Sequence, residues 1–137
     1  MIECVRVKPF EIPRWLLEQK KLWNLDVFYD FAHRNPDAWM SFLLTLDGIA
    51  IGCFIVYDDP LYDSIDTQTL IIDKAYRTEE NVSQSCRLVY LAMRAIAKEF
   101  GRKRIIAQVR DPEKFIERIG SPKGVKIGES VLMEEVG

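Results

Sequence analysis

A chain of 137 residues, 48% of them hydrophobic, is long enough for one domain with its own core, and we expect a single domain over residues 1–137. Charged residues make up 29% of the chain but leave a formal net charge of −2. This balance excludes a general attraction to nucleic acid or to an anionic membrane, and no apolar run is long enough to span a bilayer.

The three cysteines, Cys4, Cys53 and Cys86, lie within apolar patterns and lack the spacing of a metal site. They predict buried, reduced thiols and therefore a cytoplasmic location. No leader sequence is recognisable before the first expected strand. His33 is the only histidine and has no second ligand at a suitable spacing, so we expect no metal site.

The first third predicts one strand and two helices. Residues 4–7 indicate a strand that Pro9 ends, and a second helix is expected over residues 26–34. The first helix is indicated by residues at helical spacing, namely Ile12, Trp15, Leu16, Gln19 and Trp23. Core packing accounts for most aromatic residues here, which are Trp15, Trp23, Trp39, Phe28, Tyr29 and Phe31. The alternatives are an aromatic acceptor pocket, or a surface for a protein partner or for self-association. Because residues 28, 29 and 31 cannot share one helix face, at least one should be exposed.

The middle of the chain predicts a hairpin, a further strand and a long helix. Residues 40–46 and 49–57 are β-rich runs joined by Asp47-Gly48, a strong hairpin signal. A polar loop should extend to Asp66, followed by a strand over residues 67–73. An apolar stripe indicates a helix over residues 83–100, largely buried and capped by Gly101. Residues 104–109 then predict a strand whose basic entrance, residues 102–104, is typical of a solvated sheet edge.

The remaining residues predict a short helix and a final strand region. Asp111-Pro112 is a typical helix start, the helix should end near Gly120, and residues 125–136 have strand character with an interruption at Gly128. The strands on either side of the long helix should be parallel, because a helical crossover joins them. We therefore expect an α/β (α+β) fold: a mixed, mostly antiparallel central sheet with helices on both faces.

The most informative stretch is residues 70–83, where an apolar strand passes through a turn containing Arg77 into the long helix. This layout points free backbone N–H groups at an anion such as a phosphate. The turn, however, contains no glycine and carries the adjacent carboxylates of Glu79 and Glu80. The geometry favours an anion cradle, whereas the chemistry of the side chains opposes one.

Four segments in this order resemble the GNAT superfamily, the Gcn5-related N-acetyltransferases. They are the hairpin Asp47–Gly52, the strand end Ile72–Arg77, the long helix that closes at Gly101, and Phe115–Gly120, which is similar to the family's F-Y-x-x-x-G signature. The resemblance covers nearly the whole chain. It implies an acetyl-CoA site whose pyrophosphate lies on the turn after the fourth strand, with the pantetheine arm where the fourth and fifth strands separate. The cofactor-binding positions that it implies are Ile72, Arg77, Thr78, Asn81, Val82 and Ser83.

Three features depart from the family pattern. Glu80 and Val82 stand where the family's Arg/Gln-x-x-Gly-x-Gly/Ala turn has small residues. Ile116 occupies the position of a tyrosine that many members use as a general acid. The asparagine that often follows the fifth strand is absent from Arg110-Asp111-Pro112. Acetyl-CoA is therefore a doubtful cofactor.

Two functional hypotheses follow. The first is a binding or structural protein with an eroded acetyl-CoA site, similar to the GNAT-like proteins of tailed bacteriophages and then virion-associated. The second is an active acetyl-CoA-dependent N-acyltransferase for an amine, in which Arg77 and the N–H groups of residues 78–83 bind the pyrophosphate and a carbonyl of the fourth strand or a water takes the proton. Asp66 and Gln68, on or just before the fourth strand, are the candidate catalytic residues, because family enzymes carry a glutamate base there. Asp66 is also explained as an ordinary turn residue.

Overall fold

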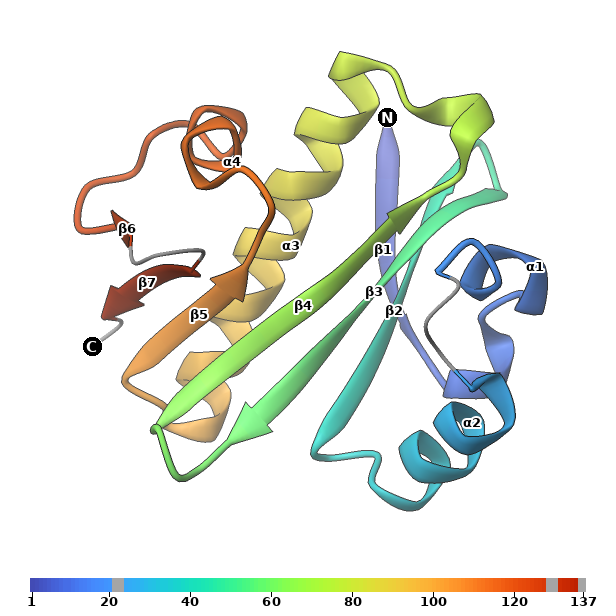
Figure 1. The fold of residues 1–137 in the computed structure, drawn as a ribbon, viewed down its shortest axis with the longest axis horizontal. Helices are drawn as coiled ribbons and strands as arrows, with labels where there is room; N and C mark the ends of the chain where they lie inside the picture. The colour runs from blue at the N-terminus through green and yellow to red at the C-terminus, as the bar shows by residue number, and fades with distance from the viewer. Residues whose placement is uncertain (21–23, 128–130, 136–137) are drawn as a thin grey trace.

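The computed structural model describes residues 1–20, 24–127 and 131–135, and Figure 1 shows a twisted sheet with helices on both faces. The strands are β1 (Ile2–Val7), β2 (Trp39–Leu46), β3 (Ile49–Asp59), β4 (Ser64–Ile72), β5 (Arg104–Gln108), β6 (Lys126–Ile127) and β7 (Val131–Glu135). The helices are η1 (Pro9–Glu11), α1 (Arg14–Leu17), α2 (Leu25–Arg34), η2 (Lys74–Tyr76), α3 (Glu79–Phe100) and α4 (Pro112–Arg118). Among these, no helix combines the length and the hydropathy needed to cross a membrane.

The sheet has the strand order β1-β2-β3-β4-β5-β7-β6. The pair β4–β5 is parallel, and the other neighbouring pairs are antiparallel, so the expected mixed topology is confirmed. The hairpin between β2 and β3 turns at Asp47 and Gly48, both with positive φ, as the Asp-Gly signal predicts.

Two cores lie on opposite faces of this sheet. On one face, α3 packs against β1–β5 through its buried stripe, which includes Val89, Met93 and Ile96. On the other face, α1 and α2 cover β3 and β4 through Leu16, Leu17 and Phe28. The expectation that α3 is buried around much of its circumference is wrong in part, because Leu91 is 59% exposed. Cys53 and Cys86 are buried free thiols, as predicted, and Cys4 is half-buried.

The first helix is much shorter than expected. α1 contains four residues behind Pro13, the chain before it forms the 3₁₀ turn η1, and Trp23 lies outside the described residues. Pro13 stands at the N-cap position of α1 and has no side-chain group that could accept a hydrogen bond from the helix. The spacing of apolar residues is therefore not enough to form a longer helix here. Phe31 is 44% exposed, which confirms that residues 28, 29 and 31 do not all face the core.

Two other boundaries differ from expectation. α3 begins at Glu79 rather than at residue 83, because Thr78 Oγ1 accepts a hydrogen bond from Asn81 N at 3.1 Å and caps the helix. β4 begins at Ser64, so Asp66 lies within the strand and not in a polar loop. The final strand region forms two short strands, β6 and β7, and Gly128 lies outside the described residues.

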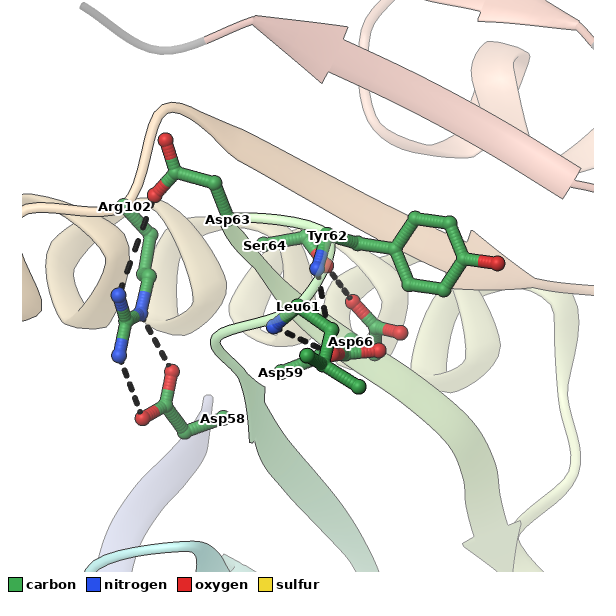
Figure 2. A network of polar contacts seen from close by, with 8 residues as sticks. All are labelled: Asp58, Asp59, Leu61, Tyr62, Asp63, Ser64, Asp66 and Arg102. Carbon is green, nitrogen blue, oxygen red and sulfur yellow. Dashed lines mark hydrogen bonds and ion pairs between the residues drawn. The ribbon is translucent and has the colours of Figure 1, made fainter.

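The basic segment before β5 is not a solvated edge. β5 lies between β4 and β7, and Arg102 forms two hydrogen bonds with Asp58 at 2.7 and 3.0 Å (Figure 2). Arg102 Nη1 also approaches Asp63 Oδ1 at 4.0 Å. This arginine therefore joins the end of β3 and the turn after it to the segment that leads from α3 into β5, a contact between residues far apart in the sequence.

Candidate functional site

The strands β4 and β5 are paired over only part of their length. Their register runs from Ser64 opposite Arg104 to Thr67 opposite Ala107, whereas β4 continues to Ile72. Figure 1 shows β5 diverging from β4 toward α4. The expected separation of the fourth and fifth strands is therefore present, and it leaves the last part of β4 without β5 as a neighbour.

A β-bulge lies at the point of separation. In the register with β3, Val56 is opposite Thr67 and Ile55 is opposite Thr69, so Gln68 has no partner residue in β3. A bulge releases the extra residue from the regular ladder and bends the strand. The candidate catalytic residues Asp66 and Gln68 thus lie next to the place where β4 leaves β5.

The Asp66 carboxylate is half-buried on β4. Ser64 Oγ donates a hydrogen bond to Asp66 Oδ1 at 2.5 Å (Figure 2). Burial raises the pKa of Asp66, the Ser64 hydrogen bond opposes this shift, and the nearby charges of Asp59 and Asp58 add to it. A carboxylate with a raised pKa holds a proton more readily than an exposed one, which suits a general base.

We expect Asp66→Asn to stabilise the protein at neutral pH. The pKa of Asp66 is higher in the folded protein than in the unfolded chain. The folded state is therefore favoured at low pH, where Asp66 is protonated, and this stability is lost as the pH rises from the unfolded pKa to the folded pKa. The variant should therefore melt above the wild type at pH 7, and the difference should shrink toward about pH 4. Thermal melts across this range test it, with Asp37→Asn at an exposed turn as the control for loss of one negative charge. A difference that grows on acidification would contradict the expectation.

The residues implied for the cofactor gather at the other end of β4, where the chain turns into α3. Ile72, Arg77, Thr78, Asn81, Val82 and Ser83 all lie there, six residues or more beyond Asp66, which is about 20 Å along a strand for the nearest of them. Arg77 Nε donates to the Ile72 carbonyl at 2.7 Å, and Asn81 Nδ2 donates to the Tyr76 carbonyl at 2.9 Å. These two side chains brace the turn itself.

The start of α3 carries two carboxylates, as the sequence indicates, and one of them is paired. Arg118 in α4 donates through Nε and Nη2 to the two oxygens of Glu79, at 3.2 and 3.1 Å. This pair lowers the pKa of Glu79, and Ser83 Oγ also donates to Glu79 Oε1 at 3.3 Å. Among the described residues, the cationic partner of Glu79 is thus Arg118. No spacing signal links positions 79 and 118, so the sequence could not reveal this contact.

Val82 is half-buried and is held in a third apolar cluster. It packs with Cys86, Ala107, Phe115 and Ile119, and Ile116 also packs against this cluster. The position at which a glycine would expose backbone N–H groups is therefore occupied by a branched side chain that binds α3 to α4. This packing and the Glu79–Arg118 pair together join the first turn of α3 to α4.

Gln19 is a polar residue near this site that the sequence indicated only as a helix position. Its Nε2 donates to Asp73 Oδ1 at 3.2 Å, directly after the end of β4. Gln19 Oε1 is buried and has no hydrogen-bond partner among the described residues. The spacing of residues in the first helix predicted Gln19 as a helix position, but the residue lies beyond the end of α1 and reaches across to the end of β4.

Comparisons with known proteins identify the fold. No protein-family model matches the chain, and no curated protein does. A probable acetyltransferase from Staphylococcus epidermidis gives a TM-score of 0.73 over 100% of both chains, at 11% sequence identity. A GNAT family acetyltransferase from Elizabethkingia anophelis with acetyl-CoA bound gives 0.62 over 98% of both chains, at 12% identity. N-acetylglutamate synthase from Neisseria gonorrhoeae, complexed with coenzyme A and N-acetyl-glutamate, gives 0.68 over 100% of this chain and 35% of that one, at 16% identity.

These similarities establish the architecture and not the activity. The chain has the mixed α/β fold of GNAT acetyltransferases, as the resemblance implied. Coenzyme A or acetyl-CoA is bound by two of the three neighbours described, at identities too low to transfer a binding site. Among the described residues, no group of three or more His, Cys, Asp or Glu side chains is placed to hold a metal ion.

Proposed function

We propose that this chain is a binding protein on the GNAT fold whose acetyl-CoA cradle has been replaced by a contact between α3 and α4. The observation that carries the proposal is the position of Val82, which packs into the cluster of Phe115 and Ile119 where the cradle requires bare backbone. The ion pair between Glu79 and Arg118 also joins α3 to α4 at the helix start, and Glu80 adds a second carboxylate there. A phosphate there would meet a like charge.

The aromatic N-terminal third is the proposed binding surface. Apolar side chains are exposed on η1, α1 and α2, with Phe10 at 64%, Trp15 at 48%, Val27 at 61% and Phe31 at 44%. Exposed aromatic residues are enriched in protein–protein interfaces, and the partner would be a second copy of the chain or another protein. Because the sequence resembles the GNAT-like proteins of tailed bacteriophages, we extend the proposal to a virion-associated role for this chain.

Isothermal titration calorimetry with acetyl-CoA tests the proposal. We expect no heat and no thermal shift at millimolar acetyl-CoA, because the branched side chain of Val82 and the carboxylates of Glu79 and Glu80 replace the small residues that the cradle requires. Micromolar binding that disappears in Arg77→Ala, but persists in Arg34→Ala on α2, would contradict it. Sedimentation velocity on the same samples examines the proposed surface, since self-association should be reduced by Val27→Ser combined with Phe31→Ser. A monomer that binds acetyl-CoA would overturn both parts.

An active N-acyltransferase is the second candidate function. It is favoured by the bulge at Gln68, which coincides with the separation of β4 from β5 and lies beside the half-buried Asp66. Asp66 or a water next to it would take the amine proton. Micromolar acetyl-CoA binding in the calorimetric experiment, with Arg77 required, would support this function over the first.

A further inference from the structure

A hollow lies at the opposite end of β1 from the start of α3. The N-terminal end of β1 meets α3, where Ile2 N donates to Gln84 Oε1 at 3.2 Å, and the strand ends at Val7 opposite Ser41. β2 extends further, to Trp39, so the edge of the sheet has a step (Figure 1). A cavity of about 350 Å³ lies at this step, within the size range of sites for small molecules.

The cavity wall combines apolar surface with one unsatisfied hydroxyl. Pro9, Pro36 and Trp39 contribute apolar surface. Ser41 also lines the cavity and is 2% exposed, and its Oγ has no hydrogen-bond partner among the described residues. A buried hydroxyl without a partner costs free energy, and a rotation about the Cα–Cβ bond of Ser41 would turn this hydroxyl toward a ligand atom in the cavity.

The charged groups of the cavity have an excess of cations. Arg6 and Lys8 line it together with one carboxylate, Glu11. Glu11 Oε1 already accepts a hydrogen bond from Lys8 N at 2.9 Å, which ties the carboxylate to its own 3₁₀ turn. Arg6 donates through Nη2 to the Pro36 carbonyl at 3.4 Å, a long contact that leaves its other donors available.

We propose that this cavity is a binding site for a small organic acid with an apolar body, distinct from the GNAT cradle. The carboxylate of the ligand would lie between Arg6 and Lys8, the apolar body would pack on Trp39 and the proline rings, and the Ser41 hydroxyl would donate to a ligand oxygen. The argument does not depend on the proposed function, because none of these residues belongs to the α3 start or to the β4–β5 separation.

Nuclear magnetic resonance titration with phenylacetate tests the site, with phenylacetamide as the neutral isostere and inorganic phosphate as the bare anion. We expect saturable shifts of the backbone amides of residues 7–8 and 39–41 at millimolar phenylacetate. Binding of phenylacetamide should be about tenfold weaker, because the cations then lack a charged partner. Inorganic phosphate should give no saturable shift at these amides. Equal binding of the two aromatic probes, or no saturation with phenylacetate, would overturn the proposal.

Two variants provide independent measurements. Arg6→Gln combined with Lys8→Gln should weaken phenylacetate but not phenylacetamide, whereas Arg34→Gln combined with Lys123→Gln makes the same charge change elsewhere and should alter neither. Ser41→Ala should weaken binding and yet leave the melting temperature equal to or above that of the wild type, because the lost hydroxyl has no protein partner. A lower melting temperature with unchanged binding would show that Ser41 has a structural role and would overturn its assignment.

Discussion

Phe54→Ala is expected to lower the free energy of unfolding by about 3–5 kcal/mol, the range observed for truncation of a buried phenylalanine. Phe54 is fully buried in β3, and its ring stacks on Phe42 of β2 with centroids 4.7 Å apart and planes inclined by 4°. It lies in the core between the sheet and α3, so the cavity left by alanine would be enclosed on both sides. Chemical denaturation followed by circular dichroism measures the loss.

Two further variants distinguish the loss of core packing at Phe54 from a loss of stability that any substitution would cause. Phe54→Leu keeps most of the volume and should cost less than Phe54→Ala, whereas Leu91→Ala removes an exposed side chain from α3 and should change stability by no more than about 0.5 kcal/mol. Equal losses for Phe54→Ala and Leu91→Ala would show that the core between the sheet and α3 is not packed as described.

Gly52→Ala is expected to cost about 1–3 kcal/mol because β3 and β4 approach closely at this position. A Cβ atom at Gly52 would lie 2.6 Å from the Ile71 carbonyl oxygen and 3.3 Å from Leu44 Cδ1. The carbonyl belongs to the backbone of β4 and cannot rotate away. Since β5 no longer accompanies β4 here, the displacement should reach the end of β4 and the turn that follows it.

Gly48→Asn is the matched control for Gly52→Ala. No atom lies within 4 Å of a Cβ at Gly48, and its φ of +80° is a conformation that asparagine tolerates better than most residues. Denaturation curves should therefore show a small change for Gly48→Asn and a large one for Gly52→Ala. A mild effect of Gly52→Ala would mean that the two strands are further apart than the structure places them.

Much of the fold could be predicted because its signals are local. The Asp47-Gly48 turn between two apolar runs fixed the hairpin, and the helix between two strands required a parallel pair, so the mixed topology followed. The cap of α3 was also encoded locally, by Thr78 three residues before Asn81, but the apolar stripe drew attention to a later start. In this case the cap, and not the stripe, determines where the helix begins.

The parts that could not be predicted depend on contacts between residues distant in the sequence. The start of β4 contains the polar residues Ser64 and Thr67, which are nevertheless buried. Their hydroxyl groups are hydrogen-bonded: Thr67 Oγ1 donates to the Ile55 carbonyl at 2.6 Å, and Ser64 Oγ donates to Asp66. Hydropathy patterns therefore assign this segment to a loop. At the candidate site, the sequence identified the departures at positions 80 and 82, but the partner of Glu79 comes from α4, 39 residues away.

The ladder between β4 and β5 is short, and α3 is a second structural link between two unequal parts of the molecule. Four residue pairs join β1–β4 to the smaller group of β5, β7 and β6, and α3 contacts strands on both sides of that junction. α4 is attached to the same helix by Glu79, Val82 and Cys86. Local opening of the smaller part would also separate α4 from the first turns of α3, which couples the integrity of the C-terminal strands to the residues that join these two helices.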